Sequence, residues 1–159
     1  LSLFYIMNQQ KADFLQKDFT SFFKNLEGDE KGKWGKMNSQ QMVEHTSAVF
    51  KVSTGKIYFP LATPVEHLPK YKEFLISEKE FRENTKSPVL PEEPLPLTKS
   101  NMHEAIDELK NDITDFFEFF KDDQTKTTLH PAFGDLNYEE WVQLHHKHVT
   151  HHLKQFGLL

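Results

Sequence analysis

The fold of this chain is decided by one stretch near its C-terminus, residues 139–156, which reads EEWVQLHHKHVTHHLKQF. Apolar residues recur in it every three or four positions, as on the buried face of a helix. His148 and His152 are four positions apart, so in a helix they lie on one face, about one turn or 6 Å from each other. Two imidazoles placed in this way can bind the same metal ion.

The remaining histidines of this stretch take different positions around the helix. His145 lies on the inward side with His148 and His152, where it could support the ligands or replace one of them. His151 lies at the edge, and His146 is expected to be a solvated surface residue. The residues that point away from the core are Gln143, His146, Lys147, Thr150 and Lys154. A buried, hydrogen-bonded histidine is the common alternative to a metal ligand, and the pattern leaves that alternative open.

A second helical stretch, residues 39–56, supplies a third histidine, His45, which shares a face with Met42, Val49 and Val52. Asn38 precedes this stretch as an N-cap, with Gln41 three residues on. Three imidazoles that converge inside a helical bundle can hold a divalent metal and leave a coordination position open, as catalytic rather than structural sites do. We therefore predict His45, His148 and His152 as metal ligands.

Two further helical stretches, at residues 9–26 and 101–121, complete the pattern. Asn137 begins the histidine-rich helix near the C-terminus, with Glu140 in a capping-box position. Residues 57–100 separate the second and third helices and contain all but one of the eight prolines. Within this segment, residues 68–81 could form a short extra helix, and residues 87–97 are expected to be extended. A connection this long inside a compact domain is best explained by a crossover that joins two parallel helices.

These observations predict an all-α fold with a single domain over residues 1–159. It is a four-helix bundle of up-down-down-up topology, with a long crossover between its second and third helices. In that topology His45 and the His148–His152 pair fall at the same end of the bundle. His130 falls at the opposite end, so we interpret it as structural.

The composition excludes several classes of function. The chain has no cysteine, so disulfides and thiolate metal sites are impossible. Its formal net charge is −5 with no basic block, which argues against a nucleic-acid partner. The six residues before Met7 are too few for a signal peptide or a membrane span, so we expect no membrane partner and a cytoplasmic protein.

Two motifs carry a resemblance to a known group of proteins. Residues 34–45, WGKMNSQQMVEH, and the pattern His148-x3-His152-x2-Gln155 resemble the DinB/YfiT-like superfamily of metal-binding four-helix bundles. Residues 130–136 and 151–157 are similar to one branch, the DUF1569-type proteins of unknown function. The resemblance covers both ends of the chain and little of residues 57–100.

The resemblance implies the same up-down-down-up bundle, with His45, His148 and His152 as ligands of zinc or nickel. Relatives include thiol-dependent transferases, a maleylpyruvate isomerase type and metal-dependent hydrolases, all acting on small-molecule substrates. Leu153 and Lys154 stand where many relatives carry Arg-Gly, so the resemblance does not decide the substrate or whether a low-molecular-weight thiol is used. DUF1569-like segments also resemble regions attached to enzymes of aromatic-CoA degradation.

The leading hypothesis is therefore a metal-dependent enzyme of the hydrolase or thiol-dependent transferase type. No catalytic residue is assigned; Glu44, His103 and Glu92 are candidates for a general base by their expected proximity alone. One alternative is a non-catalytic helical accessory or dimerisation module, forming a homodimer. Another is that the histidines form only a buried polar network. The Glu92–Glu93 pair is expected to be solvated unless it reaches the pocket.

Overall fold

The computed structural model describes residues 2–159 and is mostly helical. Its helices are α1 (Leu3–Asp13), α2 (Ser39–Ser53), α3 (Leu68–Ile76), α4 (Met102–Phe120) and α5 (Tyr138–Gln155). Helix α1 continues through a π-helical turn, Phe14–Asp18, and a 3-10 turn, Phe19–Phe23, and a second 3-10 turn, Val65–His67, precedes α3. The all-α expectation is therefore broadly right for the described residues.

One element was not expected, a small antiparallel hairpin between α4 and α5. Strand β1 (Thr128–His130) pairs with β2 (Gly134–Leu136), with His130 opposite Gly134. Gly134 has φ +82, which favours glycine. The turn is closed by His130, whose Nδ1 accepts the backbone N–H groups of Ala132 (3.0 Å) and Phe133 (3.3 Å). Strands of three residues are too short to show an alternating pattern, and the sequence therefore did not predict them.

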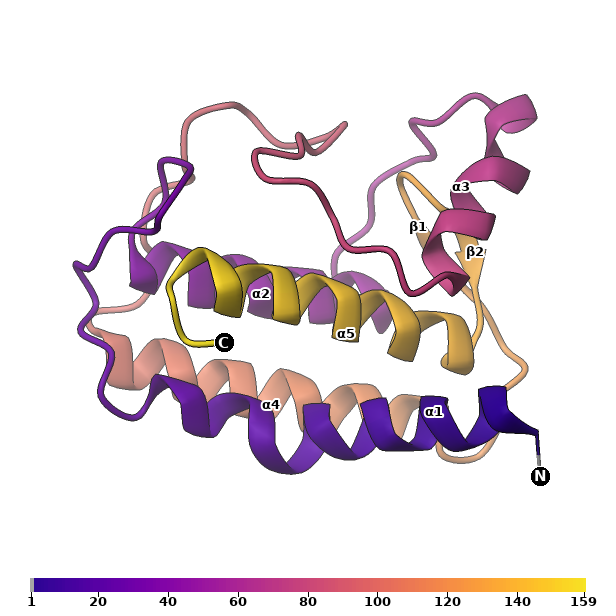
Figure 1. The fold of residues 1–159 in the computed structure, drawn as a ribbon, viewed down its shortest axis with the longest axis horizontal. Helices are drawn as coiled ribbons and strands as arrows, with labels where there is room; N and C mark the ends of the chain where they lie inside the picture. Colours follow the sequence, from indigo (N-terminus) through magenta and orange to yellow (C-terminus); the bar gives the residue numbers. More distant parts are fainter. Residues whose placement is uncertain (1) are drawn as a thin grey trace.

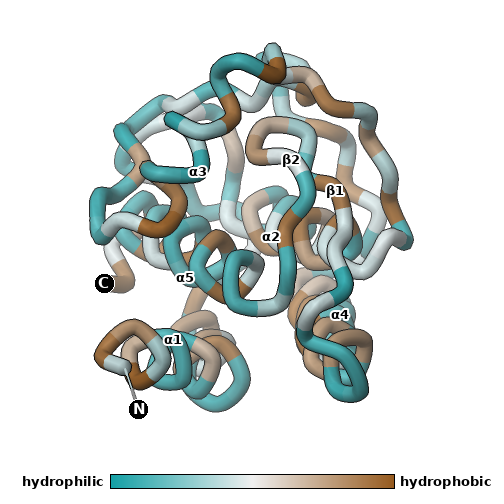
Figure 2. The backbone as a smooth tube through the Cα atoms, turned by 90° about the vertical axis from the view of Figure 1, so that its right-hand side faces the viewer, coloured by the Kyte–Doolittle hydropathy of each residue, from teal (hydrophilic) through white to brown (hydrophobic). Residues whose placement is uncertain are grey.

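The four long helices lie with their axes close to one direction (Figure 1). Helices α2 and α4 both begin at the left-hand end of that view, whereas α1 and α5 run towards it. Figure 2 shows them nearly end on, with α2 and α5 above α1 and α4. Helix α2 packs against α4 and α5, and α1 packs against α5. Helix α3 and the hairpin contact α2 and α5 from the other side, so the two histidine-bearing helices lie in the middle layer.

Both histidine-bearing helices begin at the predicted asparagine. The Asn38 side chain accepts from Gln41 N at 2.9 Å, and the Gln41 side chain accepts from Asn38 N at 2.9 Å. Asn137 and Glu140 form the same reciprocal capping box at the start of α5. An N-cap of this kind contributes about 1 kcal/mol and fixes where the helix begins. It therefore also fixes how far along each helix the histidines lie.

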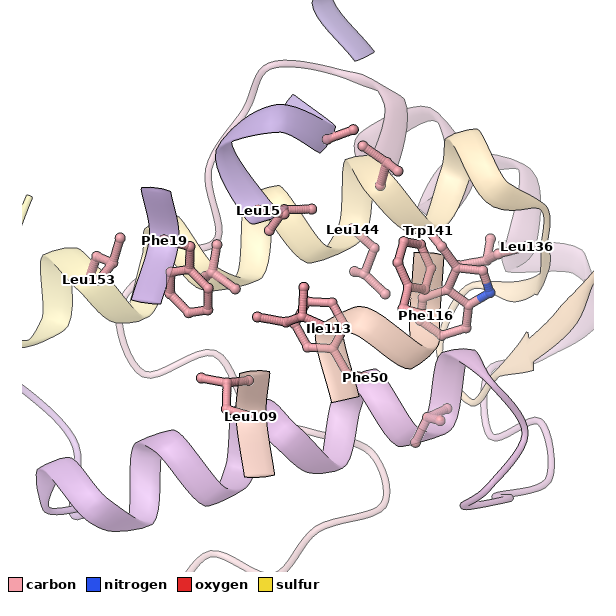
Figure 3. Packing of buried hydrophobic residues seen from close by; sticks show 14 of the residues in the cluster. Leu15, Phe19, Phe50, Leu109, Ile113, Phe116, Leu136, Trp141, Leu144 and Leu153 are labelled. Atoms are coloured by element: carbon pink, nitrogen blue, oxygen red, sulfur yellow. The ribbon is translucent and has the colours of Figure 1, made fainter. Parts of the chain in front are cut away.

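The hydrophobic core fills the space between the helices and the hairpin (Figure 3). Phe116 is fully buried and its ring contacts those of Phe50, Phe120 and Tyr138. The phenylalanines of α4 are thus packing residues, as their helical spacing indicated. Burying one such side chain stabilises the fold by roughly 1.5–3 kcal/mol. Other core side chains in Figure 3 are Leu15, Phe19, Leu109, Ile113, Leu136, Trp141, Leu144 and Leu153.

The outer face of α5 is covered rather than solvated, contrary to the expectation from its polar residues. Gln143 is only 3% exposed and Lys147 only 8%. Lys147 donates to the carbonyl oxygens of Ser77 (2.9 Å) and Lys79, and Gln143 accepts from Lys11 of α1 at 2.9 Å. The segment that follows α3 therefore lies over α5. The short extra helix expected within residues 68–81 is formed by α3, and it ends at Ile76.

Among residues 2–159, no helix has both the length and the apolar character that a membrane span requires.

Candidate metal centre

The structure brings together the three histidines that the sequence singled out. His45 comes from α2, and His148 and His152 come from α5. The Nε2 atom of His148 lies 2.9 Å from that of His45 and 2.9 Å from that of His152. One nitrogen from each of the three rings lies within 4.8 Å of the others, close enough to hold a metal ion.

Hydrogen bonds between the three rings cannot pair all three Nε2 atoms at once. Each Nε2 atom has a single position in the ring plane, occupied by either a proton or a lone pair. The Nε2 atom of His148 faces two other Nε2 atoms, and it can make a good hydrogen bond with only one of them. A cation between the rings, by contrast, accepts all three lone pairs at once.

The protonation of His152 is fixed by Gln155. The amide nitrogen of Gln155 donates to the backbone oxygen of Trp34 at 3.0 Å. Its amide oxygen therefore faces the Nδ1 atom of His152, at 2.7 Å, and must accept a proton from it. The proton of neutral His152 is thus on Nδ1, which leaves a lone pair on Nε2, directed towards the cluster. Partners of this kind orient the histidine ligands of metal sites.

Burial keeps the three rings neutral. It lowers the pKa of His45 to about 4, with a further contribution from nearby His151. Burial is also the main cause that holds the pKa values of His148 and His152 well below 6.5, and the neighbouring rings of the cluster add to it. Neutral imidazole is the form that binds metal ions, so the cluster has the required protonation state at neutral pH.

His145 lies apart from the cluster in an aromatic slot. Its ring stacks on Phe50 at a centroid distance of 3.8 Å and on Trp141 at 5.3 Å. Its Nε2 atom is 3.0 Å from the hydroxyl of Ser53, which itself donates to the carbonyl of Phe50 at 2.6 Å. The hydroxyl proton is thus used, so His145 must donate to Ser53. This side chain is held by the core and is not placed to replace one of the three histidines.

His146 differs from its expected position in solvent. It is partly buried, and its ring meets that of Phe14 edge-on at 5.5 Å. Burial lowers its pKa to about 4. The helical register was correct, because His146 does point away from the cluster. The sequence of α5 did not indicate that the π-helical turn after α1, which carries Phe14, covers this face.

The structure shows the surroundings of the three candidates for a general base. Glu44 accepts from Thr98 N and Oγ1, both at 2.7 Å, and from Lys99 N at 3.3 Å, so it fastens the crossover to α2. These hydrogen bonds lower its pKa against the effect of burial. The side chain of His103 is 85% exposed beside Asp107, and Glu92 is exposed. Glu93 forms an ion pair with Lys36, which ties the proline-rich segment to the loop that carries Trp34.

Residues from other parts of the chain surround the cluster, and the periodicity of the helices did not predict their contacts. The ring of His151 lies 5.1 Å from that of His152 and contacts Trp34 at 5.6 Å and Phe81 at 5.9 Å. Ser53 and Phe81 were not singled out, because neither belongs to a motif. Two sequence signals indicated Gln155: its place in the His-x3-His-x2-Gln pattern, and its position seven residues after His148, on the same face of the helix.

Comparison with known families places the chain in one of them. A model of a protein family of unknown function, DUF1569, matches residues 23–157. The match covers most of the chain and both parts of the histidine cluster, so the protein belongs to this family. No curated protein and no solved structure gives a significant match.

Proposed function

We propose that this member of the DUF1569 family is a metal-dependent enzyme acting on a small molecule. In this proposal the Nε2 atoms of His45, His148 and His152 bind one divalent ion, zinc or nickel. The reaction is a hydrolysis or a thiol-dependent transfer. The observation that carries the proposal is the convergence of three neutral imidazoles, with the Nε2 lone pair of His152 fixed by Gln155.

The residues present fit such an ion. Imidazole ligands suit zinc and nickel, and three of them leave a coordination position open. Zinc–nitrogen bonds of about 2.0–2.1 Å would put the ligand nitrogens about 3.3 Å apart. Two of the three separations in the cluster are 2.9 Å and the third is within 4.8 Å, so the rings would adjust to hold the ion. A divalent ion held in this way supplies Lewis acidity, which acidifies a water or a thiol and polarises a carbonyl group.

The proposed fold is a four-helix bundle of the DinB/YfiT-like kind, with up-down-down-up topology. The directions of α1, α2, α4 and α5 in Figure 1 support it, as does the long connection between α2 and α4. In this structure α2 and α5 pack against each other, and the histidines meet between them. Metal sites of helical bundles are commonly built from side chains on facing helices.

The direct test is a titration of the chelator-treated protein with zinc and with nickel, followed calorimetrically. We expect one ion per chain. The loaded protein should hydrolyse an activated ester or transfer an acyl group to a small thiol, and a chelator should stop the reaction. Binding of one ion with neither reaction would instead support the non-catalytic accessory module. Failure to bind either ion would contradict the proposal.

A second prediction concerns Gln155. Replacing it with leucine removes the acceptor for His152 Nδ1 and the donor to the Trp34 carbonyl. We expect a 10–100-fold loss of zinc affinity, the usual effect of removing a partner that orients a ligand. Gln124→Leu is the matched control, because Gln124 is exposed and lies outside both sequence motifs that carry the three histidines. Equal zinc affinity in the Gln155 and Gln124 variants would show that the amide does not orient the ligand.

A further inference from the structure

A second group of polar side chains, separate from the histidine cluster, lines a cavity of about 240 Å³ beside α5. Its walls come from α1, from residues 77–80 after α3, and from the face of α5 that carries Gln143 and Lys147. None of the three clustered histidines lines it. Its volume is below the range of about 300–1,000 Å³ for drug-sized ligands, so the cavity suits one small group.

The glutamates of this lining are already paired, whereas two of its lysines are not. Its charged side chains are Lys11, Glu78, Lys79, Glu80, Lys147 and Lys154. One glutamate pairs with Lys11 at 2.7 Å, and the other pairs with Lys154. Lys79 and Lys147 have no carboxylate within ion-pair distance among residues 2–159. The side chains of the lining therefore include two ammonium groups without a counter-charge.

Lys147 is the buried one of these two cations. Its ammonium group donates to the carbonyl oxygens of Ser77, at 2.9 Å, and Lys79, and it lies 4.6 Å from the centre of the Phe74 ring. An ammonium group has three N–H donors, so one remains after these two hydrogen bonds. Because a buried charge is costly unless it is paired, an anion in the cavity would stabilise this lysine.

Gln143 adds donors that no residue accepts. Its side-chain oxygen accepts from Lys11 Nζ at 2.9 Å, and because an ammonium group can only donate, this contact distinguishes the oxygen from the NH2 group. The NH2 group donates to no residue within 2–159, although Gln143 is buried. Lys11 uses two of its three N–H groups, on Glu78 and Gln143. All three donor residues, Lys11, Gln143 and Lys147, line the cavity, so it offers N–H groups without acceptors.

We propose that this cavity binds a phosphate group, either as the free ion or as part of a small phosphate monoester. The phosphate oxygens accept from Lys11, Gln143 and Lys147, and their charge meets the unpaired ammonium group of Lys147. A phosphate monoester carries three acceptor oxygens and about 1.5 to 2 negative charges at neutral pH, which matches several free donors and two unpaired cations. Hydrogen bonds between charged partners of this kind are roughly twice as strong as neutral ones.

The test is an NMR titration of the full, chelator-treated chain with sodium phosphate at constant ionic strength. The side-chain NH2 signals of Gln143 should shift saturably with phosphate and should not respond to sodium chloride. Acetate, which has one charge and two oxygens, should bind more weakly than phosphate. A parallel titration with glycerol phosphate distinguishes the two sources, because the tighter of the two ligands identifies either an ester or the free ion. Metal ions are absent, so the result does not depend on the proposed metal site.

Gln143→Glu is the informative variant. It keeps an oxygen that accepts from Lys11 and replaces the NH2 donors with a second, negatively charged oxygen. We expect phosphate affinity to fall at least tenfold, the usual effect of losing a hydrogen bond to a charged group. Gln124→Glu makes the same change of charge at an exposed position outside the cavity and should keep the parent's affinity.

Two results would overturn the proposal. One is an equal phosphate affinity in the Gln143 and Gln124 variants. The other is a parent chain whose Gln143 signals respond to phosphate no more than to chloride at the same ionic strength. Circular dichroism shows whether Gln143→Glu is folded, and the titration of the parent decides the question if it is not.

Discussion

Replacing His148 with alanine is expected to lower the zinc affinity of this protein at least a hundredfold. His148 is the central member of the cluster, because its Nε2 atom is 2.9 Å from both other Nε2 atoms. Its removal leaves one imidazole on each of two helices. The loss should therefore exceed the 10–100-fold effect of removing a residue that only orients a ligand.

Thermal unfolding gives a simple measurement of this loss. An ion that binds only the folded chain stabilises it by about 2.7 kcal/mol when its concentration is one hundred times its dissociation constant. The parent protein should gain this stability on addition of zinc, and His148→Ala should not. His103→Ala is the control, since that side chain is 85% exposed. His146→Ala should also keep the zinc response, because His146 packs against Phe14 on the other side of α5.

The result that would reject the metal site is a zinc-dependent shift in His148→Ala as large as that of the parent. A loss of the shift in His146→Ala with the shift kept in His148→Ala would also reject it. Circular dichroism of each metal-free variant distinguishes a failure to bind from a failure to fold.

The parts of the fold that sequence could predict are those set by local chemistry. The capping boxes at Asn38 and Asn137 are formed by residues three positions apart, so the sequence alone shows them. The inward face of α5 follows from a periodicity of 3.6 residues, and it correctly placed His148 and His152 on the cluster side.

The parts that could not be predicted depend on contacts between distant segments. Lys147 is buried because it donates to the carbonyl of Ser77, seventy positions away, and nothing in α5 itself indicates this. In the same way, Glu44 is next to His45 in sequence, yet the crossover at Thr98 occupies its carboxylate. The periodicity of a helix shows which residues share a face, but what covers that face comes from the tertiary fold.

A second large effect is expected on acidification, from two histidines outside the metal cluster. The Nδ1 atom of His130 accepts two backbone N–H groups, which it can do only while it carries no proton. Burial lowers the pKa of His130 to about 4. His145 is fully buried between Phe50 and Trp141, and burial, with a smaller effect of His130, holds its pKa well below 6.5.

Acidification should destabilise the folded chain, because the pKa values of His130 and His145 are lower in the folded chain than in the unfolded chain. Above about pH 6.5 both residues are neutral in the folded and the unfolded chain, and their contribution to stability is fully present. As the pH falls below 6.5, the unfolded chain takes up a proton at each of these two residues that the folded chain does not, as it also does at the other buried histidines. The free energy of unfolding should then fall by about 1.4 kcal/mol per pH unit for each histidine, down to pH 4 for His130. For His130 this amounts to about 2 kcal/mol by pH 5, and His145 contributes a loss of the same sign, against the 5–15 kcal/mol that stabilises a typical domain.

The measurement is urea unfolding of the metal-free protein at a series of pH values between 7.5 and about 4.5. His130→Asn is the informative variant, because an asparagine oxygen can accept the N–H groups of Ala132 and Phe133 and cannot be protonated in this range. Its stability should fall less steeply with pH than that of the parent, by about 1.4 kcal/mol per pH unit, the contribution of one proton. His103→Asn, at an exposed position, should keep the parent's dependence. If His130→Asn kept the parent's slope instead, the folded chain would bind a proton at His130 as readily as the unfolded chain does, and the role of its unprotonated Nδ1 in closing the hairpin would be wrong.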